Sequence, residues 1–291
     1  MQRLPAFKDE LMPAGQQERQ IHRFTGSCGF VYNNALALQK ERYEQGGKKL
    51  GYAGLCKMFT GWCNSAETAW LADAPVHPLQ QTLRDLDRAS SNFFARRTDF
   101  PRCRKKGQSD RFRYLYPKQI RFDRGNIRIF LPKLGWMRYR NSRQVTGIVK
   151  NLTVSQSCGK WYISIQTEYE VSEPVHSSTS MVGLDAGVAK LATLSYGTVF
   201  ESVNSFQKKR AGLLRQLIRK VKFSNNWQKQ KRKIQRLHSR IANIHRDYLH
   251  KVTTTISKNH AMIVIEDLKV SNMSRPAAGT VRPPVEAGPP K

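Results

Sequence analysis

The feature that most constrains the fold is a pair of apolar runs, typical of buried strands, that each end in an acid. Val182 to Leu184 ends at Asp185, and Met262 to Ile265 ends at Glu266. After the first run, turn signals at Ala186-Gly187 and Tyr196-Gly197 predict a meander of three strands. A long helical pattern then precedes the second run. The order is therefore three antiparallel strands, a helical crossover and a fourth strand.

That order is the topology of a ribonuclease H-like sheet, in which the first and fourth strands lie side by side and parallel. Asp185 and Glu266 would then face each other at one edge. Two carboxylates that close repel each other unless a cation joins them, so we expect Mg²⁺ or Mn²⁺ on oxygen ligands. With two such metals, one would activate a water and the other would stabilise the leaving oxygen during in-line attack on phosphorus.

Each acid also has a simpler interpretation. Asp185 precedes Ala-Gly, where an aspartate commonly forms a turn. Glu266 could be a surface acid at the end of a strand, and strand alternation directs Asp267 to the other face. The pair, in this order around this topology, is more specific than either acid alone.

The charge balance favours a nucleic-acid partner. The 291 residues include 50 Lys and Arg against 21 Asp and Glu, a formal net charge of +29. A polyanion is the natural partner of such a chain, and a metal-dependent nuclease is the sharpest hypothesis. No apolar run reaches the roughly 18 to 20 residues of a spanning helix, and the first residues lack the apolar core of a signal peptide, so we expect a cytoplasmic protein without a membrane partner.

The predicted crossover, helical from 206 to 258 with a break near Ser224, Asn225 and Asn226, is strongly basic. Its second half carries an apolar seam, most simply core, formed by Ile234, Leu237, Ile241, Ile244, Tyr248 and Val252. Its other faces carry fifteen Lys and Arg between Lys208 and Lys251 against the single acid Asp247. Balanced surface ion pairs cannot account for that excess, so we expect contacts with nucleic acid here. The candidates are Arg219, Lys220, Lys231, Arg232 and Lys233.

The first half of the chain divides into helical and strand-like parts. Phe7 to Met12 is a strand candidate, and helical spacing runs from Gln16 to Glu44 and again from Pro78. Alternation with turns begins after Phe100 and includes a hairpin with its turn at Ser157-Cys158-Gly159-Lys160. We expect a mostly antiparallel β-barrel from 1–14 and 99–172, a helical bundle at 15–98, a linker at 173–181, a second domain at 182–272 and a disordered tail at 273–291. The five cysteines, without any CxxC pair, are expected to be reduced packing residues.

Basic and aromatic residues interleave between Phe100 and Arg121. Arg111 and Arg113 alternate with Phe112 and Tyr114, a mixture that suits backbone neutralisation with base stacking. An ordinary solvated strand face is the alternative. The candidate nucleic-acid contacts in this half of the chain are Arg84, Arg102, Arg104, Lys105 and Lys106.

The chain resembles the transposon-encoded TnpB (OrfB) proteins, RNA-guided DNA endonucleases related to type V CRISPR effectors. The resemblance implies an α+β multidomain protein in which a β-barrel (wedge) holds a helical recognition insert and a RuvC-like nuclease domain follows. It implies DNA and a guide RNA from the transposon end as partners, with Asp185 and Glu266 as the first two catalytic acids. The matching stretches are FTGSCGFVYNNALALQKERY, LQQTLRDLDRASSNFFARR, FPRCRKK, LPKLGWMRYR, VGLDAGVAKLATLS and VIEDLKVSNM.

Two departures from the family shape the expected function. Gly29 stands where similar proteins often carry Arg. Family members continue with a zinc ribbon on two CxxC pairs and a third catalytic Asp, which this chain lacks, so the RuvC-like domain is expected to be incomplete and to hold metal more weakly. We expect RNA-guided DNA binding and metal-dependent cleavage associated with DNA transposition and recombination. The alternatives are a cleavage-deficient guided or transposon-end DNA-binding protein, acting as a regulator or remnant, and a basic nucleic-acid scaffold without a guide.

Overall fold

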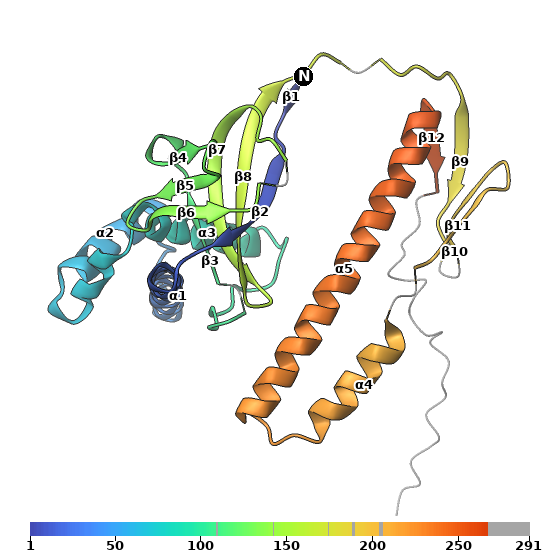
Figure 1. The fold of residues 1–291 in the computed structure, drawn as a ribbon. Coiled ribbons are helices and arrows are strands. Elements are labelled where there is room, and N and C mark those ends of the chain that lie inside the picture. Colours follow the sequence, from blue (N-terminus) through green and yellow to red (C-terminus); the bar gives the residue numbers. More distant parts are fainter. Residues whose placement is uncertain (109, 142, 174, 188–189, 204–205, 267–291) are drawn as a thin grey trace, which may run out of the picture. The chain divides into compact units, whose positions relative to one another are not determined.

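The computed structural model describes residues 1–266 except 109, 142, 174, 188–189 and 204–205. The chain forms two compact units, Met1–Glu173 and Pro174–Lys291 (Figure 1). The boundary falls in the polar segment predicted to be a linker. Asp267 and the predicted tail lie outside the described residues.

The first unit contains a group of helices that agrees with the predicted helical segments. The periodic apolar positions Ile21, Phe24, Val31 and Ala35 are all buried on one face of the first helix, which shows why this stretch is helical. The Gln17 side chain caps the N-terminus of that helix, because its Oε1 accepts a hydrogen bond from Ala14 N at 3.0 Å. The helices are α1 (Gly15–Glu44), α2 (Tyr52–Asn64), the 3₁₀ segment η1 (Ala66–Asp73) and α3 (Val76–Phe94).

An eight-stranded antiparallel sheet forms the rest of the first unit. Its strands pair in the order β3-β7-β8-β2-β6-β5-β4, and β1 pairs with β8. The predicted turn between the two longest strands is present, with φ +53° at Cys158 and +78° at Gly159, as a tight hairpin turn requires. The strands are β1 (Gln2–Arg3), β2 (Ala6–Met12), β3 (Arg111–Tyr114), β4 (Arg121–Asp123), β5 (Arg128–Leu131), β6 (Gly135–Tyr139), β7 (Ile148–Ser157) and β8 (Lys160–Glu170).

The predicted closed barrel is not seen in the described residues. Closure would require β3 and β4, the two ends of the strand order, to pair with each other, and they do not. The helices pack against the β3 end of the sheet instead, where Phe24 of α1 meets Phe112 edge to face with ring centroids 6.1 Å apart. The architecture is therefore an open antiparallel sheet with helices packed on it.

Strand β3 corrects the base-stacking interpretation for Phe112 and Tyr114, whereas Tyr116, the next aromatic of the alternation, is 54% exposed. Phe112 and Tyr114 are 3% and 1% exposed, so neither ring is available to a base. Arg111 is exposed on the other face, and Arg113 Nε donates to Thr153 Oγ1 at 3.3 Å. The alternation is the ordinary in-and-out pattern of a strand with one buried face.

The second unit has the predicted topology. Its sheet has the order β11-β10-β9-β12, and β9 and β12 are parallel. Val182 and Leu194 form a small core with Val252 and Ile256 of the last helix, which covers one face of the sheet. The elements are β9 (Met181–Asp185), β10 (Lys190–Leu194), β11 (Val199–Glu201), α4 (Gln207–Ile218), α5 (Asn225–Asn259) and β12 (Met262–Ile265).

Strand β12 is not buried as predicted. Its four side chains are between 38% and 67% exposed, because among the described residues β12 lies at the sheet edge and pairs only with β9. An apolar run can therefore indicate a strand without indicating that its side chains are covered.

Candidate functional site

The parallel pairing of β9 and β12 places the two predicted acids at neighbouring positions. Val264 pairs with Gly183, and Ile265 pairs with Leu184. The next position on β9 is Asp185, and the next residue after β12 is Glu266. Neighbouring strands are about 4.8 Å apart. Two residues far apart in the chain are thus brought together at one end of a strand pair.

The acids lie on the face of the sheet opposite α5. Leu184 packs with the core formed by Val182, Val252 and Ile256, and strand alternation directs the following residue, Asp185, to the other face. On that face Gly183 N donates to Ser195 Oγ at 3.2 Å, which holds the loop after β10 against β9.

A third residue with a side-chain oxygen lies beside the acids. Thr193 of β10 is the antiparallel partner of Asp185. Asp185 is therefore flanked by a hydroxyl-bearing residue on one strand and by Glu266 on the other. Both acids are exposed, so they are not held by burial, which corrects the expectation of acids that close buried strands.

These donors suit a hard cation. Mg²⁺ is usually bound by one or two carboxylates, with water and substrate phosphate completing its coordination. Two adjacent carboxylates on an exposed sheet edge match that pattern. Within the described part of the chain, no group of three or more His, Cys, Asp or Glu residues could hold a metal, so protein groups alone do not form a closed metal cage here.

The helical hairpin of α4 and α5 carries the predicted basic surface. The apolar seam of α5 faces inward: Ile234, Leu237 and Val252 are buried, and Ile241, Ile244 and Tyr248 are half-buried. Ser224 caps α5 by accepting a hydrogen bond from Trp227 N at 3.2 Å, as predicted for the break between the helices. Within the described residues, one of the fifteen cations forms an ion pair: Lys251 Nζ lies 2.7 Å from an Asp247 carboxylate oxygen.

Helical geometry separates these cations into different directions. Each residue turns the helix by about 100°, so Arg232 points directly away from the buried positions Gln230, Ile234 and Leu237. Five exposed cations fall within about 100° of one another along roughly 16 Å of the helix. This basic stripe consists of Lys229, Arg232, Lys233, Arg236 and Arg240.

The predicted contacts on the hairpin differ in availability. Arg232 and Lys233 belong to the basic stripe, and Arg219 is also exposed, whereas Lys220 is half-buried. Lys231 points about 100° away from Arg232, and its Nζ lies 5.1 Å from the centre of the Trp227 ring. Lys229, Arg236 and Arg240 belong to the fifteen cations but not to the five predicted contacts, although helical positions counted from the apolar seam identify them.

The predicted nucleic-acid contacts of the first unit also differ in exposure. Arg102, Lys105 and Lys106 are exposed. Arg84 is exposed as well, with its guanidinium 4.7 Å from the centre of the Tyr52 ring. Lys105 and Lys106 line a cavity of about 560 Å³ beside Gly26 and Gly29 of α1. A Cβ added at either glycine would meet no atom within 4 Å, so the helix surface is open there.

Arg104 is a structural residue rather than an open contact. Its guanidinium lies 4.2 Å from the centre of the Tyr32 ring and 3.8 Å from the Asp85 carboxylate. Its backbone N–H donates to Asn33 Oδ1 at 2.8 Å. Burial lowers the pKa of Arg104 from its usual value. Arg104 therefore joins its segment to α1 and α3.

Family models match both ends of the chain. Residues 164–277 match the OrfB family of IS605 elements, described as a probable transposase, and residues 1–48 match its helix-turn-helix domain. In the structure residues 1–48 contain β1, β2 and the single 30-residue helix α1. This segment therefore contains one helix and not the two helices of a helix-turn-helix.

Two curated relatives match almost the whole chain. It is 69% identical over 287 residues to a protein of Escherichia coli strain K12 named "Putative RNA-guided DNA endonuclease InsQ", covering 98% of this chain and 71% of that protein. It is 33% identical over 275 residues to a "Putative RNA-guided DNA endonuclease" of Streptomyces pristinaespiralis, covering 92% of this chain and 68% of the relative.

A weaker likeness exists to a solved structure, a cryo-EM structure of the Cas12f1-sgRNA-target DNA complex. The identity is 12% and the TM-score 0.33, over 91% of this chain and 73% of the other, which is too low to support an argument about this chain.

The fold and site define a basic, mixed α/β protein with two acids at the end of a parallel strand pair. The chain belongs to the OrfB (TnpB) family of IS605-type transposon proteins, as the family models and the two curated relatives show. No helix in the described residues has the length and apolar character needed to cross a membrane.

Proposed function

We propose that this chain is an RNA-guided DNA-binding protein with metal-dependent DNA endonuclease activity, linked to DNA transposition. The observation that carries the proposal is the parallel register that brings Asp185 and Glu266 together. Family membership and the names of the two relatives support the guide RNA and DNA as partners.

Each part of the second unit has a role in this proposal. Asp185 and Glu266 supply carboxylate oxygens to one or two divalent cations, and the Thr193 hydroxyl lies beside Asp185 to orient water or a carboxylate. When bound, Mg²⁺ or Mn²⁺ supplies activation of a water and stabilisation of charge on the phosphodiester. The basic stripe of α5 contacts phosphates of the guide or the target. The two acids have the separate role of holding the metal.

The finer architecture is also part of the proposal. We assign the open antiparallel sheet to the wedge, α1 to α3 to the recognition insert, and β9 to β12 with their crossover helices to a RuvC-like domain. The second-unit strand order and its parallel pair support the last assignment.

A guided binding protein that does not cut is the second candidate. The observation in its favour is that two acids, and no third His, Cys, Asp or Glu, meet at this edge within the described residues. Hard-cation affinity follows the number and charge of the ligands, so a site of two acids depends more on substrate phosphate to hold its metal.

Plasmid cleavage with matched variants tests the proposal. The full chain is incubated with guide RNA transcribed from the transposon end, Mg²⁺ and a plasmid target library. We expect guide-dependent cuts from the wild type and none from Asp185→Ala or Glu266→Ala, with DNA retention unchanged in both. Glu201→Ala, which removes an exposed acid two strands from β9, is the matched control and should cut normally.

The outcomes separate the candidates. Guide-dependent retention without cutting by the wild type would support the second candidate. Retention of DNA that does not depend on the guide RNA would contradict both candidates and support a basic nucleic-acid scaffold. Loss of folding in Asp185→Ala, measured by circular dichroism, would assign that residue a structural role in place of metal binding.

A further inference from the structure

An aromatic pocket lies in the first unit, away from the acids. It has a volume of about 110 Å³ and is lined mainly by apolar atoms, comparable with the roughly 150 Å³ engineered cavity that accepts benzene in another protein. The end of α1 contributes Tyr43, the end of α3 contributes Phe93 and Phe94, and the following segment contributes Phe100. The pocket is therefore large enough for one planar ring.

The aromatic rings of the pocket meet edge to face or tilted, and three of them are exposed. Phe93 meets Phe100 at 5.2 Å with an interplanar angle of 89°, and meets Phe94 at 5.4 Å and 65°. Tyr43 and Phe94 are tilted by 49° with centroids 6.4 Å apart. None of these pairs is stacked face to face. Tyr43, Phe94 and Phe100 are 70%, 54% and 45% exposed, so the cluster presents several large rings to solvent.

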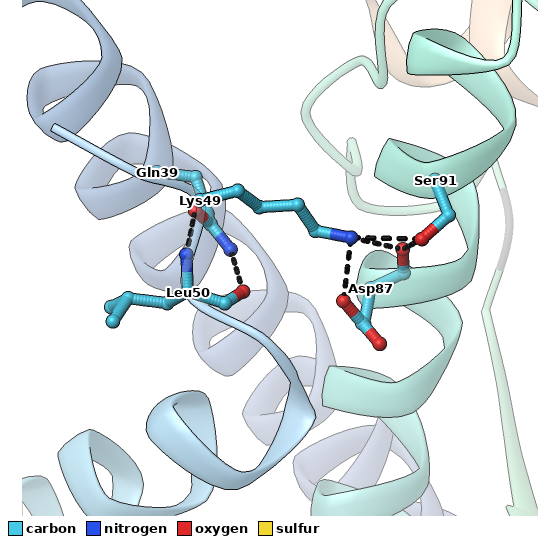
Figure 2. A network of polar contacts seen from close by, with 5 residues as sticks. All are labelled: Gln39, Lys49, Leu50, Asp87 and Ser91. Atoms are coloured by element: carbon cyan, nitrogen blue, oxygen red, sulfur yellow. Dashed lines mark hydrogen bonds and ion pairs between the residues drawn. The ribbon is translucent and has the colours of Figure 1, made fainter. Parts of the chain in front are cut away.

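Polar contacts fix the wall of the pocket. Figure 2 shows Lys49 reaching from the segment after α1 to α3, where its Nζ lies 2.7 Å from an Asp87 carboxylate oxygen and donates to Ser91 Oγ at 2.8 Å. The Gln39 side chain holds the same segment to α1, because its amide donates to Leu50 O at 2.6 Å and accepts from Leu50 N at 3.1 Å. The pocket is thus pre-formed, which lowers the cost of binding.

The charge around the pocket identifies the class of occupant. Residues 40–50 and 93–100, which contribute most of its lining, contain six Lys and Arg and three Asp and Glu. Lys49 is committed to Asp87, but Arg96 and Arg97, directly after Phe94, are exposed. An apolar ring site surrounded by cations fits a ligand that is aromatic at its centre and anionic at its edges. An unpaired nucleobase with its flanking phosphates has that composition.

We propose that this pocket, formed by Tyr43, Phe93, Phe94 and Phe100, is a stacking site for an unpaired base of a nucleic-acid strand. The inference rests on the proposed function for the presence of nucleic acid, and it adds a place where a single unpaired base is held. A base in a duplex is stacked on both sides and cannot enter, so the site selects an unpaired nucleotide. Its chemistry is shared by RNA and DNA.

Photocrosslinking locates the base directly. The full chain is mixed with single-stranded 12-mers of RNA and of DNA that carry one 5-iodouracil, a base that reacts with stacked aromatic side chains under long-wavelength light. The expected adducts, mapped by peptide mass spectrometry, lie on Tyr43, Phe94 or Phe100. A fully paired duplex of the same sequence should not compete for them. The RNA and DNA arms show which strand supplies the base.

Binding of the same 12-mers to variants measures the contribution of stacking. Phe94→Ala should weaken single-strand binding roughly 5- to 150-fold, the range for loss of one stacked base. Phe94→Trp should restore it, whereas Phe94→Leu, which keeps apolar bulk without a ring, should not. The control is Trp136→Ala, since Trp136 is 44% exposed on β6 of the same unit and lies outside the pocket.

The two proposals fail differently. If the wild type retains no single strand at any salt concentration, both are wrong. If it retains the strand with normal salt dependence but the adducts lie elsewhere and Phe94→Ala binds normally, the pocket inference alone is overturned. Circular dichroism of each variant ensures that a loss of binding is not a loss of folding.

Discussion

Neutralising part of the basic stripe tests whether α5 contacts phosphate. The change is Arg232→Gln, Lys233→Gln and Arg236→Gln in one chain. These three side chains are exposed and lie within about 100° of one another on the helix. One nucleic-acid backbone can therefore contact all three. Because none is buried, the free energy of unfolding should change by no more than about 0.5 kcal/mol.

The magnitude follows from counterion release. Each phosphate contact contributes about 0.9 to the slope of log K against log salt for duplex DNA, and about 0.7 for a single strand. Loss of three contacts should lower that slope by about 2 to 3. At 0.1 M salt the affinity should fall on the order of 100- to 500-fold, and the difference should vanish towards 1 M salt.

Fluorescence anisotropy with labelled DNA and RNA from 0.05 to 0.5 M salt measures this slope. The control is Lys231→Gln, because Lys231 points about 100° away from Arg232 and lies over the Trp227 ring. We expect its slope to change by less than one. An unchanged slope in the triple variant, with normal folding, would refute the assignment of the basic stripe as a phosphate contact.

Three further predictions concern stability and reactivity. Arg96 has φ +55° at the end of α3, a conformation that costs a residue with a side chain about 1–2 kcal/mol, so Arg96→Gly should raise the free energy of unfolding by about 1 kcal/mol in urea titrations; a decrease would show that its side chain compensates. Ile256→Ala should lower that free energy for the second unit by about 2–4 kcal/mol, because Ile256 is 4% exposed in its small core, and a loss below 1 kcal/mol in calorimetry would contradict the packing of α5 on the sheet. Burial raises the pKa of the Cys28 thiol to about 11, which leaves roughly one thiolate in a thousand at pH 8; exposed Cys103 should therefore react with iodoacetamide far faster at pH 8, and comparable rates in the native protein would be inconsistent with a buried Cys28.

Local patterns were sufficient for the element order of both units. The helix from Gly15 to Glu44, the turn at Cys158-Gly159 and the break capped by Ser224 were all predicted, because helical spacing, turn residues and caps act over a few residues. The topology of the second sheet was predicted for the same reason, since a meander followed by a long helix leaves few ways to add a fourth strand.

The candidate site was predicted only in part. That β9 and β12 are parallel neighbours is confirmed, and their register ends one residue before Asp185 and Glu266. Their roles as metal ligands stay predictions. Sequence reasoning was wrong about the burial of β12, because apolar composition does not tell which strand lies at an edge of the sheet. It also could not separate Arg104, held by Tyr32 and Asp85, from its exposed basic neighbours.

The sequence by itself determined the periodicities, the charge excess and the order of strands and helices, because each depends on residues close together in the chain. Only the tertiary structure decided which side chains share a surface. It buried Phe112 and Tyr114, left the first sheet open, and brought together Tyr43 and Phe94, which lie 51 positions apart in the chain. Those outcomes depend on packing between distant segments, and no local pattern records them.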